Sequence, residues 1–204
     1  MRFYAGQIIT LCYILSMPFG AYQTIHSIAL EQHGIFTAEQ ARAAGVSPMA
    51  LVMMAKRGRL ERLAHGLYRD AAAPATRWTP YVIAILWPGE VVGVLSHDTA
   101  LDLMELSDVN PGVIHVTVPK HYRARHRLPP AGVVFHHADL ASDEVGSVDG
   151  LPVTTAIRTI WDCAASQLGP ALLRQAIDDG QTKGWLTPEE TMRLTEELTT
   201  TGRL

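Results

Sequence analysis

Two helix-capping signals lie close together in this chain and constrain its fold more than any other feature. Thr37 precedes the segment AEQARAA with Gln40 three residues later, which is the capping-box arrangement at the start of a helix. Gly45 ends that helix, and Ser47 followed by Pro48 supplies a second cap with proline at the first helical position. Two short helices joined by a glycine turn are typical of a helix-turn-helix.

The flanking segments predict a complete winged helix-turn-helix domain over residues 22–70. Residues 22–33 place apolar side chains at helical spacing and are followed by a glycine. The third helix is expected from residue 48 to about residue 57. The sequence RLERLAHGLYR then alternates around His65-Gly66, which predicts a small hairpin, the wing.

Basic residues are concentrated in this predicted domain, although the formal net charge of the 204-residue chain is only -3. Residues 56–69 contain five bases and one acid, whereas residues 139–204 contain eleven acids and five bases. Guanidinium and ammonium groups bind backbone phosphates, so we expect the front domain to bind DNA; a solvated charged face is the alternative. The expected DNA-binding residues are Ser47, Lys56, Arg57, Arg59, Arg62, His65 and Arg69.

The third helix itself is a poor reader of base edges. Its helical period turns Met49, Val52 and Met53 outward, and these side chains cannot hydrogen-bond a base. An exposed stripe of this kind more often marks a packing surface. We expect it to dock on the apolar N-terminal segment or on a second subunit, which leaves DNA contact to the wing and the helix end.

Residues 1–21 form an apolar N-terminal extension. The run from Ile8 to Met17 resembles the hydrophobic part of an export signal, but no A-x-A cleavage site follows, and the run is shorter than the ~20 residues that span a bilayer. We expect an ordinary helix or strand, or an extension upstream of an alternative start at Met17, and no membrane association. Cys12 and Cys163 are too far apart for a disulfide framework, which favours a cytoplasmic protein.

The second half of the chain predicts a separate domain over residues 81–204, after a proline-bearing linker at 71–80. Residues 91–95 read as a buried strand, and Ser96 is expected to cap the helix that follows it. The segments IHVTVP and VVFHH predict two further strands, and Asp149-Gly150 predicts a hairpin turn.

Helical patterns occupy the chain from Thr154 onward, and the first of them pairs Arg158 with Asp162 four residues later. The predicted fold class is therefore α+β: an N-terminal winged helix-turn-helix followed by a mixed α+β domain with a helical C-terminal tail.

Four segments, taken in order, resemble the AbiEi-type antitoxins of bacterial type IV toxin-antitoxin systems. They are GRLERLAHGLYR, VLSHDTALDLMELSDV, IHVTVP and VDGLPVTTAIRTIWDCA, within a match that covers residues 22 to about 185. The resemblance implies a winged-helix domain that represses its own operon at operator DNA. It also implies a second domain that neutralises a cognate nucleotidyltransferase-type toxin.

This chain departs from the family pattern at one place. The third helix of such antitoxins is commonly rich in arginine, whereas Met49, Val52 and Met53 stand here. The departure bears on operator binding more than on antitoxin activity.

A basic loop in the second domain predicts an anion or RNA patch, with tRNA as a candidate partner. Lys120, Arg123, Arg125 and Arg127 lie together with several aromatic and histidine side chains and with no acid nearby in the sequence. A solvated surface loop is the alternative.

The sequence predicts no metal site and no cofactor. Its nine histidines have no convincing ligand spacing, and His136 and His137 point to opposite faces of a strand. The adjacent Ser96, His97 and Asp98 resemble a catalytic triad only on paper, because neighbouring residues seldom assemble one. No glycine-rich phosphate motif occurs, which disfavours an enzyme.

Two alternatives stay open at this point. Type IV antitoxins neutralise a toxin without a stable complex, so the chain can be an atypical protein kinase that phosphorylates the toxin with ATP and magnesium. The weak catalytic candidates for that reaction are Lys120, Asp98, Asp139 and Asp162. The second alternative is a plain transcriptional regulator.

Overall fold

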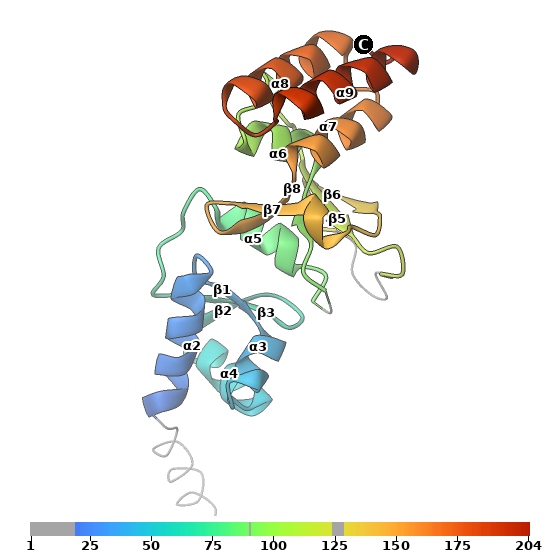
Figure 1. Cartoon of the computed structure of the whole chain (residues 1–204). Coiled ribbons are helices and arrows are strands. Elements are labelled where there is room, and N and C mark those ends of the chain that lie inside the picture. The colour runs from blue at the N-terminus through green and yellow to red at the C-terminus, as the bar shows by residue number, and fades with distance from the viewer. Residues whose placement is uncertain (1–18, 90, 124–128) are drawn as a thin grey trace, which may run out of the picture. The chain divides into compact units, whose positions relative to one another are not determined.

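The computed structural model describes residues 19–89, 91–123 and 129–204, and these residues fall into two compact units (Figure 1). One unit ends at Ile83 and the other begins at Ala84. The division lies inside helix α5 (Thr79–Leu86), which begins within the segment predicted as a linker. No helix in the described ranges is both long and apolar enough to cross a lipid bilayer.

The N-terminal unit is a winged helix-turn-helix, as predicted. Its described elements are α2 (Phe19–Glu31), β1 (Ile35–Thr37), α3 (Ala38–Ala43), α4 (Pro48–Lys56), β2 (Leu60–Ala64) and β3 (Leu67–Asp70). Helix α2 begins earlier than the predicted residue 22. Residues 1–18 of the predicted extension 1–21 lie outside the described residues. Its last three residues, 19–21, belong to α2.

Both predicted helix caps are confirmed. Thr37 Oγ1 accepts the Gln40 N–H at 3.1 Å, and Gln40 Oε1 accepts the Thr37 N–H at 2.8 Å. Ser47 Oγ accepts the Ala50 N–H at 3.2 Å. Each cap satisfies backbone donors that the first turn of a helix would otherwise leave without partners.

The wing is the hairpin formed by β2 and β3, and it turns at His65-Gly66, where Gly66 has a φ of 72°. A strand that the sequence did not predict, β1, pairs antiparallel with β3 and completes a sheet in the order β1-β3-β2. Three residues are too few to show the alternation of a strand, so only the pairing identifies β1.

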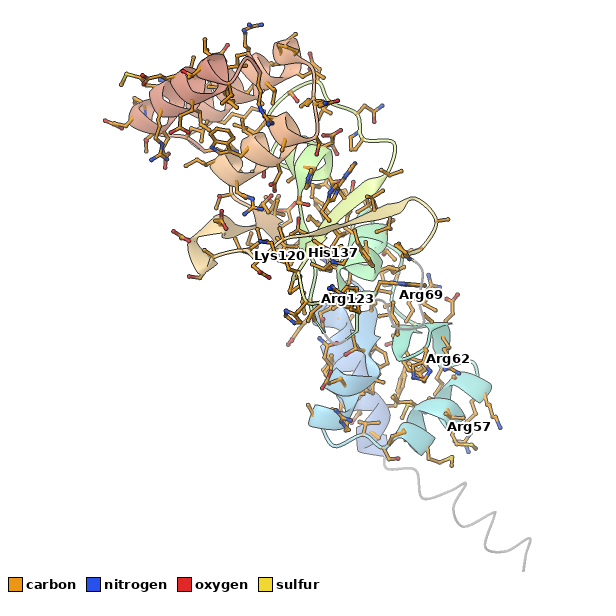
Figure 2. All side chains as sticks on the ribbon, turned by 90° about the vertical axis from the view of Figure 1, so that its right-hand side faces the viewer. Arg57, Arg62, Arg69, Lys120, Arg123 and His137 are labelled. Atoms are coloured by element: carbon orange, nitrogen blue, oxygen red, sulfur yellow. The ribbon has the colours of Figure 1, made fainter. Side chains whose placement is uncertain are left out.

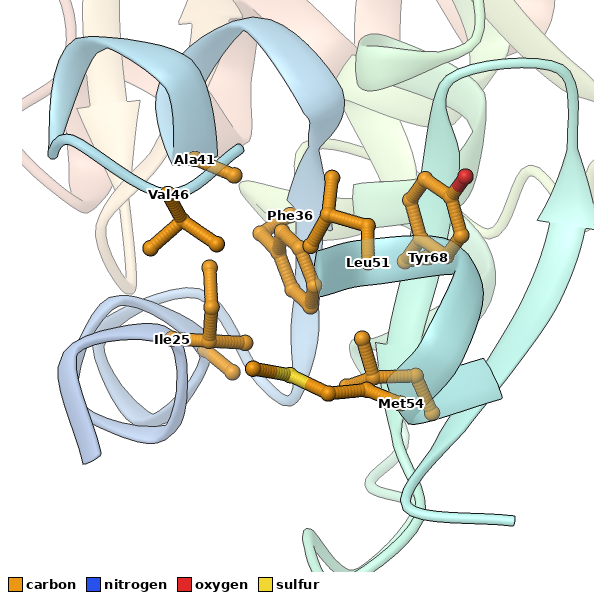
Figure 3. Close-up of a cluster of buried hydrophobic side chains, with 9 residues drawn as sticks. Ile25, Phe36, Ala41, Val46, Leu51, Met54 and Tyr68 are labelled. Carbon is orange, nitrogen blue, oxygen red and sulfur yellow. The ribbon is translucent and has the colours of Figure 1, made fainter. Parts of the chain in front are cut away.

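Apolar side chains from the helices and the sheet form the core of this unit (Figure 3). Ile25 of α2 and Leu51 and Met54 of α4 are buried together with Phe36 of β1 and Tyr68 of β3, whose rings stack with centroids 5.8 Å apart. Because one face of α4 is buried here, the opposite face of that helix is turned to solvent.

The C-terminal unit contains a mixed five-stranded sheet in the order β6-β5-β4-β8-β7. Its strands are β4 (Val94–Leu95), β5 (Ile114–Val118), β6 (Val133–His137), β7 (Val145–Val148) and β8 (Leu151–Thr154). The pairs β5–β6 and β4–β8 are parallel, and the pairs β4–β5 and β7–β8 are antiparallel. The predicted turn between β7 and β8 is confirmed, since Asp149 and Gly150 both have positive φ, at 49° and 81°.

Helices α6 (His97–Leu103), α7 (Ala156–Ala165), α8 (Pro170–Thr182) and α9 (Pro188–Thr200) lie together in this unit, and a short 3-10 helix, η1 (Ser142–Glu144), precedes β7 (Figure 1). The predicted pair on α7 is confirmed, with Arg158 Nε 2.9 Å from Asp162 Oδ1. The α+β class and the helical tail are therefore as predicted.

Strand β4 is shorter than predicted, because the chain makes a close approach just before it. Only Val94 and Leu95 of the predicted strand 91–95 pair with neighbours. At Gly93 the N–H donates to the Ile85 carbonyl at 2.8 Å, and a Cβ at this position would lie 2.3 Å from Val116 Cγ1. This approach excludes residues before Val94 from the sheet.

Candidate functional site

The end of α4 and the wing present exposed cations. Lys56 and Arg57 are exposed where α4 ends, and Arg62 is exposed on β2. Figure 2 draws Arg57, Arg62 and Arg69 along the same side of the N-terminal unit. The folded wing thus brings bases from two separate elements to one surface.

The other predicted DNA-binding residues differ in what they contact. Arg69 is half-buried and its Nε lies 3.0 Å from Glu61 Oε2, so an acid already compensates its charge. Arg59 is exposed, and its guanidinium lies over the Tyr22 ring at 5.3 Å from the centroid. Arg69 is therefore less suited than Arg62 to meet a phosphate.

The tip of the wing carries a hydrogen-bonded pair. The Arg62 Nη2 lies 3.3 Å from His65 Nδ1, and both side chains are exposed. Ser47 is also exposed, but its hydroxyl oxygen already accepts the Ala50 N–H as the cap of α4. A hydroxyl in this position keeps its own proton for donation to a ligand oxygen.

The outward face of α4 is apolar. Met49 is 68% exposed and Val52 is 40% exposed, while Met53 is half-buried. These side chains offer no hydrogen bond to a base edge. We expected this stripe to dock on the apolar N-terminal segment or on a second subunit; residues 1–18 of that segment lie outside the described residues, so the expectation stays a prediction.

The basic loop after β5 is less isolated from acids than the sequence suggests. Lys120 is exposed, yet its backbone N–H donates to Asp139 Oδ1 at 3.0 Å, because the parallel strand β6 brings residue 139 beside the end of β5. Tyr122 is buried against Phe135 and His137, so its ring is not an open platform for a base. The fold thus places an acid near Lys120 and buries the Tyr122 ring, whereas binding of an anion or RNA by this loop stays a prediction.

Arg123 in the same loop turns back on its own backbone. Its Nη1 donates to the Lys120 carbonyl at 2.7 Å and to the Tyr122 carbonyl at 2.9 Å. Arg125 and Arg127, the remaining cations predicted for this patch, lie outside the described residues.

The four candidates for phosphoryl transfer do not form one described cluster. Lys120 meets Asp139 only through its backbone. Asp162 is bound to Arg158, and burial raises the pKa of its carboxyl. The Cys163 thiol donates a hydrogen bond to Asp98 Oδ1 at 3.6 Å. Burial raises the pKa of this thiol, which therefore keeps the proton that it donates.

The tertiary fold brings three histidines together that their sequence spacing does not connect. His97 is the first residue of α6, His115 lies on β5 and His136 lies on β6. His136 is paired with Thr117, which places it on the same sheet face as His115, two residues earlier on the neighbouring strand. His136 and His137 point to opposite faces as predicted, but His136 meets partners from other elements.

The three rings form a stack. The centroids of His97 and His136 are 3.6 Å apart, those of His115 and His136 are 5.1 Å apart, and His115 Nδ1 lies 2.8 Å from His136 Nε2. We call this set of His97, His115 and His136 the histidine cluster.

Burial lowers the pKa of every member of the histidine cluster. The pKa of His97 falls to about 3 and that of His136 to about 4, each first through loss of water and then through the neighbouring imidazoles. Burial also lowers the pKa of His115, whereas the Asp98 carboxylate acts in the opposite direction. All three rings are therefore neutral at pH 7.

Hydroxyl groups surround the histidine cluster. His97 Nδ1 lies 2.9 Å from Ser96 Oγ, and the Thr117 hydroxyl donates to the same Oγ at 2.8 Å. Ser96 occupies the cap position of α6, but its side chain does not cap the helix as predicted, because these two contacts hold it elsewhere. Since Asp98 contacts Cys163 and not His97, the three adjacent residues 96–98 do not assemble a triad.

The family match lies in the N-terminal unit, and a solved structure aligns with most of the chain. Residues 23–69 match the family described as "Transcriptional regulator, AbiEi antitoxin". No curated protein matches the sequence. The crystal structure of RV2827C protein from Mycobacterium tuberculosis aligns with a TM-score of 0.42 and 14% identity, over 87% of this chain and 80% of that chain.

Proposed function

We propose that this chain binds operator DNA and neutralises a cognate toxin, because residues 23–69 match the family of AbiEi antitoxins and transcriptional regulators. The toxin is a nucleotidyltransferase encoded beside it, and the system is of type IV. The winged helix represses the operon, and the C-terminal unit protects the cell.

The observation that carries the DNA-binding half is the group of exposed cations at the end of α4 and on the wing. Lys56, Arg57 and Arg62 are exposed on two elements that the apolar core holds together. Such groups bind phosphates without reading sequence. The apolar face of α4 leaves Met49 and Val52 to contact thymine methyl groups at most.

Fluorescence anisotropy with a duplex from the upstream region of the operon tests this half. We expect Arg57→Gln with Arg62→Gln to weaken binding of the full chain and to lower the salt slope by about 0.9 for each lost phosphate contact. Arg174→Gln, an exposed arginine on α8, is the matched charge control and should leave both quantities unchanged. A salt slope of the unaltered chain near zero contradicts DNA binding by this surface.

Coexpression with the neighbouring toxin tests the antitoxin half. We expect the chain to restore growth that the toxin arrests, without a stable complex in size-exclusion chromatography. Persistent arrest at matched expression contradicts the proposal.

The phosphotransferase route receives less support from the described contacts. Asp162 is held by Arg158, and Asp98 is engaged by Cys163, so neither is presented for a magnesium ion. Labelled ATP supplied with the toxin distinguishes the routes, because a pure binding protein transfers no label.

A further inference from the structure

We propose that the histidine cluster of the C-terminal unit, His97, His115 and His136, binds one Zn²⁺ ion. Each of the three imidazoles offers one ring nitrogen, and these three atoms lie within 4.8 Å of one another. Three imidazole nitrogens are a donor set that zinc accepts, with the remaining position left to water or another ligand.

The spacing of the ring nitrogens is close to the spacing in a zinc site. Nitrogens bound to a tetrahedral zinc at ~2.05 Å lie about 3.3 Å apart. The pair His115 Nδ1 and His136 Nε2 is now at 2.8 Å, and the widest pair is within 4.8 Å. The three rings are stacked with interplanar angles of 17° to 21°, and a ring nitrogen binds a metal ion in the plane of its ring. Binding therefore requires the His97 ring to turn out of the stack.

The rings carry the protonation state that a metal requires. Zinc binds neutral imidazole, and the 2.8 Å contact between His115 Nδ1 and His136 Nε2 requires one of these two facing nitrogens to lack a proton. The N–H that now lies between His115 and His136 moves to the other nitrogen of its own ring when the ion binds, so the histidines change tautomer without losing a proton overall.

Neighbouring hydroxyl groups hold the histidine cluster in place. In metal sites, a hydrogen bond to the ring nitrogen that does not bind the metal plays the same part. Ser96 Oγ lies 2.9 Å from His97 Nδ1, so the hydroxyl engages this nitrogen and leaves Nε2 for the metal ion. The Thr99 hydroxyl accepts the backbone N–H of His115 at 2.9 Å and so ties α6 to β5.

The backbone at His97 is also unusual. Its φ is 53°, in the left-handed region that residues with a Cβ seldom adopt, and the residue begins a helix there. Conformations of this kind cost free energy and concentrate at functional sites. The conformation turns the His97 ring onto His136, with which it stacks.

Zinc titration of the full chain, purified without a histidine tag and treated with a chelator, tests the proposal. We expect one Zn²⁺ per chain by isothermal titration calorimetry, and a visible absorption band of tetrahedral Co²⁺ when cobalt replaces zinc. The melting temperature should rise with added zinc, because a ligand that binds only the folded state stabilises it.

Two variants on one strand provide the matched comparison. His136→Gln removes a ligand, and His137→Gln changes the next residue, which is exposed and points to the opposite face. We expect His136→Gln to abolish both the cobalt band and the zinc-dependent rise in melting temperature, and His137→Gln to retain both. Ser96→Ala should weaken zinc binding by ~10- to 100-fold, the usual effect of removing a residue that hydrogen-bonds to a metal ligand.

Circular dichroism in the absence of metal establishes that His136→Gln is folded. If that variant is unfolded, His115→Gln and His97→Asn take its place, and asparagine tolerates the left-handed backbone at residue 97. Zinc binding that survives in folded variants of all three histidines overturns the proposal, as does the absence of zinc binding by the unaltered chain.

Discussion

Asp70 is the residue at which the polar contacts between the elements of the N-terminal domain converge. Its side chain is fully buried, accepts the Tyr22 hydroxyl at 3.0 Å and the Ala72 N–H at 3.0 Å, and pairs with His26. Burial and the Asp70 carboxylate together raise the pKa of Tyr22. One carboxylate at the end of β3 thus joins α2 to the sheet that carries the wing.

We expect Asp70→Ala to destabilise the N-terminal domain by about 2–3 kcal/mol, because three donors lose an acceptor that water replaces only in part. Chemical denaturation of the full chain, followed by circular dichroism, measures this loss. Glu31→Ala, at an exposed acid near the end of α2, should stay within ~0.5 kcal/mol. A loss for Asp70→Ala no larger than that of the control would show that the buried contacts contribute little.

At the scale of elements, the entry into β4 depends on the absence of a side chain at Gly93. A Cβ there would lie 2.3 Å from Val116 Cγ1, and Val116 is itself fully buried on β5. A methyl group at residue 93 would therefore displace Val116 from its place on β5, the strand that also carries His115 of the histidine cluster.

Gly93→Ala should therefore cost about 1–3 kcal/mol through overpacking of the C-terminal core. Gly112→Ala is the matched control, since a Cβ at Gly112 would meet nothing within 4 Å. The unfolding free energies of the two variants, measured in urea, decide the point. Equal stability of the two would mean that β4 and β5 separate easily.

At the scale of the whole molecule, the two compact units carry different chemistry. Exposed bases gather on the winged helix, whereas residues 139–204 contain more acids than bases. This division follows the two halves of the proposed function, since phosphate attracts the first unit and repels much of the second.

We expect the two halves of the function to separate by mutation. The double variant Arg57→Gln with Arg62→Gln should bind the operator more weakly and repress it less. It should still restore growth in cells that express the toxin, when a foreign promoter supplies the same amount of protein. Growth curves and a reporter fused to the operon's own promoter measure the two effects. Loss of protection together with loss of repression would place toxin neutralisation on the winged helix.

The sequence by itself determined the local features of this protein. The caps at Thr37 and Ser47, the turn at Asp149-Gly150 and the Arg158–Asp162 pair all depend on residues within a few positions of one another. Local hydrogen bonding and backbone conformation decide such features, so they can be read before the fold is known.

Only the tertiary structure decided which distant residues meet. Strand pairing defines β1 and places Asp139 beside Lys120. The buried Thr117 hydroxyl donates to the Ser96 hydroxyl, which therefore does not form its predicted helix cap. The histidine cluster belongs to the same class of feature, because strand register and one left-handed residue place its three rings together. Register depends on packing across the sheet, which no spacing along the chain records.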